Sequence, residues 1–136
     1  MAGRIMGIDH GDVRIGIALS DETAFLASPL TTVQNGKAAL DEIVTLTVEH
    51  DVEKIIVGLP RNMNGTFGPA TEKVRAFIDK LSKKTDLPIA EWDERLSTVS
   101  AHNALREAGL DGRKRKGVVD MAAAQIILQN YLDAQP

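Results

Sequence analysis

Cysteine is absent from this chain of 136 residues, and aromatic side chains make up only 4% of it. Without cysteine the chain can form neither disulfides nor thiolate metal sites. This is compatible with a reducing cytoplasm, and we expect a cytoplasmic protein. With so few aromatic side chains, stacking on planar ligands is not expected to be its main mode of recognition, which leaves shape and polar contacts.

Long apolar stretches are also lacking. The first apolar run ends at Asp9, too early for a signal-peptide core or a membrane span, so we expect no membrane attachment. Hydrophobic residues still make up 43% of the chain and charged residues 26%, as in globular proteins. Because no linker or repeat divides the chain, we expect residues 1–136 to form a single domain.

The net charge of −3 counts against a nucleic-acid binder, since such proteins are generally basic. A local exception is the cationic run just before Asp120, formed by Arg113, Lys114, Arg115 and Lys116. Charge runs are commonly solvated loops, which is one interpretation. The other is a flexible basic loop that holds phosphate groups beside an acidic site.

Apolar periodicity predicts an α/β fold. Short apolar runs indicate five strands, at residues 4–9, 13–19, 24–27, 54–58 and 87–92. Apolar residues three and four positions apart indicate four helices: one after Gly36, one over 70–81, one from Ser97 or Thr98 to Gly109, and one over 118–132. The first two strands should form a hairpin, and the order of elements predicts a mixed sheet with helices on its faces.

Asp9 ends the first predicted strand and precedes a turn at Gly11. An aspartate in this position often closes a tight turn through its side chain, which is one interpretation. In open α/β sheets, however, ligands bind outside the carboxyl ends of strands, and Asp9 lies at such an end.

Asp120 opens the last predicted helix and shares a helical face with the apolar residues Ala124, Ile127, Leu128 and Tyr131. The helix dipole favours an acid at this end, but it does not require the face that packs on the sheet. A carboxylate on that face is costly unless something satisfies it, and a metal ion would do so.

Glu94 follows the last predicted strand, where it either pairs with Arg95 at the surface or serves a site. Its neighbour Asp93 is an alternative, because adjacent strand residues point to opposite faces and only one can face inward. Three converging carboxylates can hold divalent cations, and cations held in this way cleave phosphodiesters. We therefore predict a metal site formed by Asp9, Glu94 and Asp120.

The segment 58–66 is rich in polar and turn-forming residues. It lacks the Gly-Lys-Ser/Thr end of a P-loop, so binding of nucleoside triphosphates is not indicated. We expect it to contact a substrate backbone through Arg61, Asn62 and Asn64, with an ordinary connecting loop as the alternative.

Four segments, in this order, resemble motifs of the YqgF/RuvX family, which is related to Holliday-junction resolvases and has a ribonuclease H-like fold. They are residues 7–16 (GIDHGDVRIG), 57–65 (VGLPRNMNG), 93–98 (DERLST) and, within 120–129, the segments 120–123 (DMAA) and 127–129 (ILQ). The resemblance extends over essentially the whole chain. Actin-like ATPases carry a similar first turn, but they need two such domains and this chain has room for one.

The resemblance implies a nuclease that depends on Mg²⁺ or Mn²⁺ and matures the 5′ end of pre-16S ribosomal RNA. It assigns catalysis and metal binding to Asp9, Glu94 and Asp120. Substrate binding is expected from the cationic and amide side chains of Arg14, Arg61, Asn62, Asn64, Arg95, Arg113, Lys114, Arg115 and Lys116.

Two positions depart from the family pattern. His10 replaces a larger apolar or aromatic residue; it either assists at the site next to Asp9 or, as we expect, lies in a solvent-facing turn. No fourth acid accompanies Asp120, which bears on whether one or two metal ions bind. The sequence leaves open structured RNA or branched DNA as substrate, and a monomer or a homodimer. A Holliday-junction resolvase and a non-catalytic RNA-binding module are the alternatives to the rRNA nuclease.

Overall fold

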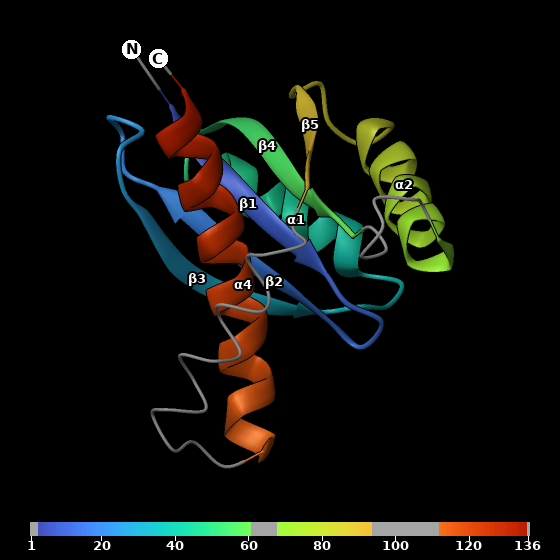
Figure 1. Ribbon diagram of the computed structural model, residues 1–136. Helices are drawn as coiled ribbons and strands as arrows, with labels where there is room; N and C mark the ends of the chain where they lie inside the picture. Colours follow the sequence, from blue (N-terminus) through green and yellow to red (C-terminus); the bar gives the residue numbers. More distant parts are fainter. Residues whose placement is uncertain (1–2, 61–67, 94–111, 136) are drawn as a thin grey trace.

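The computed structural model describes residues 3–60, 68–93 and 112–135, and for residues 112–120 it describes the backbone alone. This part of the chain forms a five-stranded mixed sheet with helices on both faces (Figure 1). The strands are β1 (Arg4–His10), β2 (Arg14–Ser20), β3 (Ala27–Gln34), β4 (Val52–Leu59) and β5 (Ile89–Asp93). The helices are α1 (Ala39–Glu49), α2 (Pro69–Ser82) and α4 (Gly112–Ala134).

The strands follow the order β3-β2-β1-β4-β5 across the sheet. β2 pairs antiparallel with both β1 and β3, which confirms the predicted hairpin. β1 pairs parallel with β4, and β4 pairs parallel with β5. The neighbouring strands β1, β4 and β5 therefore end at the same edge of the sheet, and Asp9 lies near the end of β1, the central strand of the five.

The two faces of the sheet bury separate sets of side chains, because successive strand residues point to opposite sides. One face packs α1 and α2 over residues such as Met6 and Ile8 of β1. The opposite face packs α4 over residues such as Ile5 of β1 and Ile56 of β4. The stripe predicted on the last helix is buried there, and it consists of Ala124, Ile127, Leu128 and Tyr131.

The third strand lies later in the chain than predicted, so the expectation of a strand over 24–27 was wrong. The carboxylate of Asp21 accepts hydrogen bonds from the backbone N–H groups of Phe25 and Leu26, and these bonds fold the segment into a turn. Ala24 accordingly has a positive φ of 61°. The strand that follows contains Pro29, which is tolerated because β3 is an edge strand.

The helices predicted after Gly36 and over 70–81 are confirmed as α1 and α2. The helix predicted up to Gly109 lies outside the described residues. α4 begins at Gly112 rather than near Val118, so the cationic run 113–116 is helical and the expectation of a loop was wrong. Lysine and arginine are good helix formers, so the last helix can begin several residues earlier in the chain and include this run. None of the helices in the described residues is long and apolar enough to cross a membrane.

Candidate active site

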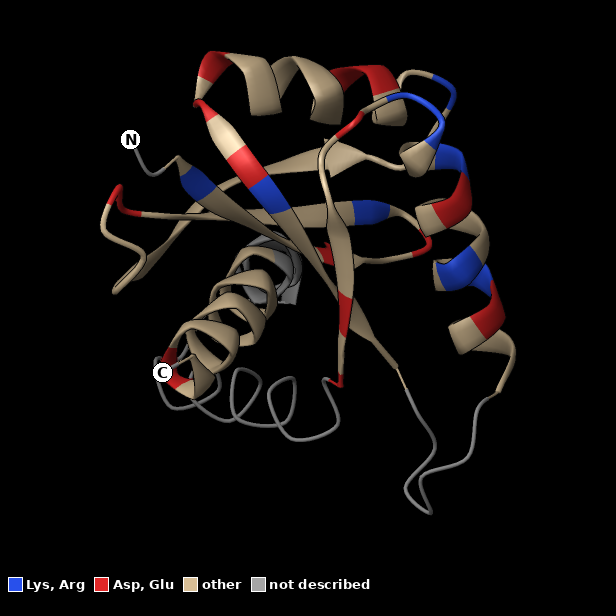
Figure 2. Ribbon diagram, turned by 90° about the horizontal axis from the view of Figure 1, so that it is seen from above, with Lys and Arg blue, Asp and Glu red and all other residues tan. Residues whose placement is uncertain are grey.

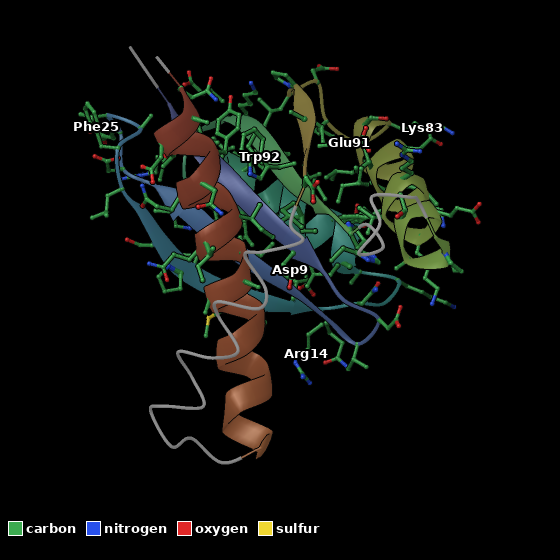
Figure 3. The ribbon with its side chains drawn as sticks, in the orientation of Figure 1. Asp9, Arg14, Phe25, Lys83, Glu91 and Trp92 are labelled. Atoms are coloured by element: carbon green, nitrogen blue, oxygen red, sulfur yellow. The ribbon has the colours of Figure 1, made fainter. Side chains whose placement is uncertain are left out.

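Asp9 lies on the face of the sheet that α4 covers. In β1, Ile5 belongs to the cluster under α4, whereas Met6 and Ile8 pack toward α1 and α2. Strand alternation therefore directs Asp9 to the same side as Ile5 and Gly7. Its side chain is partly buried at the edge where β1, β4 and β5 end (Figure 3).

Glycines flank Asp9 on both neighbouring strands. Gly16 of β2 pairs with Asp9, and Gly58 of β4 follows Val57, the partner of Ile8. These two positions therefore add no side chain next to the carboxylate. We did not predict either glycine as part of the site. The available signal was a glycine inside a strand, which often marks the close approach of a ligand or of another backbone.

α4 crosses this face in the direction opposite to β1 (Figure 1). The two elements meet at Gly7, where an added Cβ atom would lie 2.7 Å from the Cβ of Leu128 and 3.0 Å from the carbonyl oxygen of Ala124. From this contact, Asp9 lies two residues along β1, about 7 Å away. Asp120 lies four residues back along α4, about 6 Å in the same direction. The backbone of Asp120 is thus at the end of the sheet where Asp9 lies.

The side chains of β5 show which face of the sheet Asp93 occupies. Trp92 packs with the cluster under α4, and its ring centroid is 5.5 Å from that of Tyr131. Glu91 points the other way and forms an ion pair of 3.2 Å with Arg75 of α2. By alternation, the exposed Asp93 shares the side of Glu91 and not that of Asp9. Glu94 lies outside the described residues.

Among the residues predicted to bind substrate, Arg14 is the one whose side chain the structure describes. It lies two positions before Gly16 in β2, so the two share the α4 face. Figure 3 shows it at the end of the sheet where Asp9 lies. The run 113–116 belongs to the first turns of α4. The remaining predicted residues are outside the described part of the chain: Arg61, Asn62, Asn64 and Arg95.

His10 faces the opposite side of the sheet from Asp9, and the expectation of a solvent-facing turn residue was wrong. Its ring centroid lies 4.8 Å from that of Phe77, and its Nε2 atom is 3.3 Å from Nδ2 of Asn35. Burial lowers the pKa of His10, and the Asp12 carboxylate opposes the shift. His10 lines a cavity of about 360 Å³ between α1, α2 and the β1–β2 turn, so its ring lies across the sheet from the Asp9 carboxylate.

Within the described residues, no three histidine, aspartate or glutamate side chains lie close enough together to hold a metal ion. Of the three acids predicted to do so, Asp9 is described with its side chain, Asp120 is described by its backbone, and Glu94 is outside the described range. The carboxylate that is described suits Mg²⁺ or Mn²⁺, because these hard cations prefer oxygen donors.

The strand order, the hairpin at the start and the helices on both faces together define a ribonuclease H-like fold. Solved structures share it. Thermus thermophilus RuvC in complex with a Holliday junction substrate matches with a TM-score of 0.58 at 13% identity, over 97% of this chain and 94% of that one. The fowlpox virus Holliday junction resolvase matches with a TM-score of 0.60 at 11% identity, over 97% and 99%.

The chain belongs to the RuvX family, whose sequence profile, described as "Holliday junction resolvase", matches residues 3–134. A relative from Halothermothrix orenii, named "Putative pre-16S rRNA nuclease", is 49% identical over 134 residues, which are 97% of this chain and 96% of the relative. A relative of the same name from Desulforamulus reducens is 49% identical over 133 residues, which are 96% and 97% of the two chains.

Proposed function

We propose that this protein is a metal-dependent nuclease that hydrolyses phosphodiester bonds and processes the 5′ end of pre-16S ribosomal RNA. The observation that carries the proposal is the position of Asp9, a partly buried carboxylate where three parallel strands end, on the face crossed by α4. The names of the relatives support the choice of substrate.

In this proposal Asp9, Glu94 and Asp120 bind Mg²⁺ or Mn²⁺. When bound, the metal activates a water molecule and stabilises negative charge on the leaving oxygen. The protein itself contributes the fixed positions of the carboxylates. β1 is the central strand and is held by both neighbours, so Asp9 is presented from a rigid element.

Phosphate binding is assigned to cations around this edge of the sheet. Arg14 lies on the same face as Asp9, and the run 113–116 begins the helix that crosses this face. Cations of this kind bind a nucleic-acid backbone without reading its sequence. This distribution allows a chain with a net charge of −3 to bind RNA through one locally basic region.

The proposal is tested by incubating the protein with a labelled 5′ fragment of pre-16S rRNA, with unstructured single-stranded RNA and with a four-way DNA junction. Each substrate is incubated with Mg²⁺, with Mn²⁺ and with a chelator. We expect metal-dependent cleavage of the rRNA fragment, abolished by Asp9→Asn and by Asp120→Asn. The matched control is Asp93→Asn, which should retain activity. Metal-dependent cleavage that persists in Asp120→Asn would refute the assignment.

A Holliday-junction resolvase is the second candidate, favoured by the description of the family and by the fold shared with RuvC. Two symmetric cuts in a junction require a two-fold dimer. Paired nicking of the junction together with a dimer in sedimentation would favour this activity over rRNA processing. Binding of RNA that survives removal of all three acids, with no cleavage, would favour a non-catalytic module.

A further inference from the structure

Two large apolar side chains stand exposed on the turn between β2 and β3. Phe25 is 77% exposed and its neighbour in the chain, Leu26, is 62% exposed. Single exposed apolar residues are common on protein surfaces, so one of them alone would carry no weight. We call this pair the apolar tip.

The turn that carries the apolar tip is held by hydrogen bonds on both sides. The Asp21 carboxylate accepts the backbone N–H groups of Phe25 at 2.8 Å and Leu26 at 3.1 Å, as well as the hydroxyl of Thr23. From α4, Gln129 donates to the carbonyl of Phe25 at 2.9 Å and accepts the N–H of Ala27 at 2.9 Å. The two side chains are therefore presented by a preorganised backbone, which lowers the entropic cost of binding a partner.

Acidic groups surround the apolar tip. Asp21 and Glu22 belong to the same turn, and the Gln129 amide that holds Phe25 also donates to the Asp133 carboxylate at 3.0 Å. The carboxyl end of α4 adds the negative end of the helix dipole, and its last turn contains no basic residue. A cation of the described chain also lies here: Nη2 of Arg4 is 3.8 Å from Oε1 of Glu22. Figure 2 shows these acidic positions on the turn and at the end of α4, away from the basic residues of α2.

The apolar tip also lies far from the candidate active site. The turn that carries it follows Ser20, which lies beside Ile5 at the start of β1: the backbone N–H of Ile5 donates to the Ser20 hydroxyl at 2.8 Å. Asp9 lies four residues further along β1, about 13 Å away. Figure 3 shows Phe25 and Asp9 in separate parts of the molecule.

From these observations we infer that the apolar tip docks on a protein with a basic, apolar-lined surface, and that this protein is part of the ribonucleoprotein particle in which the rRNA substrate is packaged. The inference rests on the proposed function. The acidic surroundings repel phosphate, so they disfavour RNA as the partner and favour one of the basic proteins that coat rRNA. A paired aromatic and aliphatic anchor is typical of the centre of a protein interface.

The test compares binding to purified precursor small-subunit particles with binding to the same RNA stripped of its proteins, in chelator so that no cleavage occurs. The variant is Phe25→Ser with Leu26→Ser, and the matched control is Val48→Ser, which alters a side chain 74% exposed on α1. We expect the double variant to bind the particle at least about tenfold more weakly and the stripped RNA unchanged. Val48→Ser should bind both as the wild type does.

Charge reversal separates a protein partner from RNA. With a basic protein as partner, Glu22→Lys combined with Asp133→Lys should weaken binding to the particle, whereas contact with RNA would make the same change strengthen it. Unchanged binding of the double serine variant to the particle would overturn the inference. An equal loss of binding to stripped RNA would also overturn it, since the tip would then contact RNA. So would a loss of self-association of the double variant in sedimentation, since the tip would then bind a second copy of this chain. Because cleavage is not the readout, docking can hold even if the proposed nuclease activity fails.

Discussion

The indole ring of Trp92 meets the phenol ring of Tyr131 edge to face, with 5.5 Å between the ring centroids and 85° between the ring planes. This contact joins the last described strand to the helix that crosses the sheet. It also sets the direction of the side chains at the end of β5. Trp92 is turned toward α4, and Asp93, the next residue, is turned toward the other face.

The first prediction concerns metal binding. If Asp9 is a metal ligand, Mg²⁺ or Mn²⁺ should stabilise the native protein by about 2.7 kcal/mol at a hundredfold excess over Kd. Asp9→Asn should remove this stabilisation, and a chelator should reverse it. Asp93→Asn should retain it, because Asp93 belongs to the opposite face. Thermal unfolding with and without metal measures the effect, and loss of the shift in Asp93→Asn would contradict the assignment of faces.

The second prediction concerns the contact between β1 and α4. Gly7→Ala should destabilise the protein by about 1–3 kcal/mol, because the added methyl would overlap the backbone of α4 and the Cβ of Leu128. Gly36→Ala is the control, since an added Cβ there meets no atom within 4 Å. Urea unfolding at neutral pH compares the two. Equal stability of the two variants would mean that α4 can shift without cost.

The third prediction concerns acid stability. The Thr23 hydroxyl and the N–H groups of Leu26 and Phe25 lower the pKa of Asp21 from 3.8 to about 2. The ionised form is favoured in the folded state, so its contribution is complete above pH 3.8 and is lost as the pH falls toward 2.

Asp21→Asn should therefore be less stable than the wild type near neutral pH, and the difference should shrink as the pH falls through this window. Urea unfolding at a series of pH values measures it. Glu22→Gln, at the next acidic residue of the same turn, is the control. A difference between wild type and Asp21→Asn that is independent of pH would show that the charge of Asp21 does not hold the turn.

The fourth prediction concerns the carboxyl end of α4, away from Asp120, where Tyr131 contacts Lys54 of β4. The Lys54 ammonium donates to the Tyr131 hydroxyl at 2.6 Å and lies 5.0 Å from the ring centroid. Tyr131→Phe should cost about 1 kcal/mol, since it removes the hydrogen bond and keeps the ring. Lys54→Met should remove the same bond, so the double variant should cost less than the sum of the two. Strict additivity would indicate that the two groups are not coupled.

Local pattern was sufficient for much of the fold. In α2, the spacing of Val74, Phe77 and Leu81 predicts a buried face, and all three are buried. In β1 and β2, apolar runs around a short turn predict the hairpin. The pattern failed at β3, because hydrogen bonds accepted by the Asp21 carboxylate hold residues 21–26 in a turn, and because an edge strand tolerates Pro29. It also failed at the start of α4, where the charged residues 113–116 carry no apolar periodicity.

For the site, the sequence by itself determined that Asp9 lies at the carboxyl end of the first strand and that Asp120 belongs to an apolar helix, since both follow from the residues next to them. The tertiary structure decided that α4 lies across the face on which Asp9 stands, through the close approach of Gly7 to Ala124 and Leu128. It also decided that Asp93 belongs to the other face, through the packing of Trp92 on Tyr131. Local periodicity gives the spacing of side chains along one element, whereas only packing between elements determines which face of a sheet a helix covers.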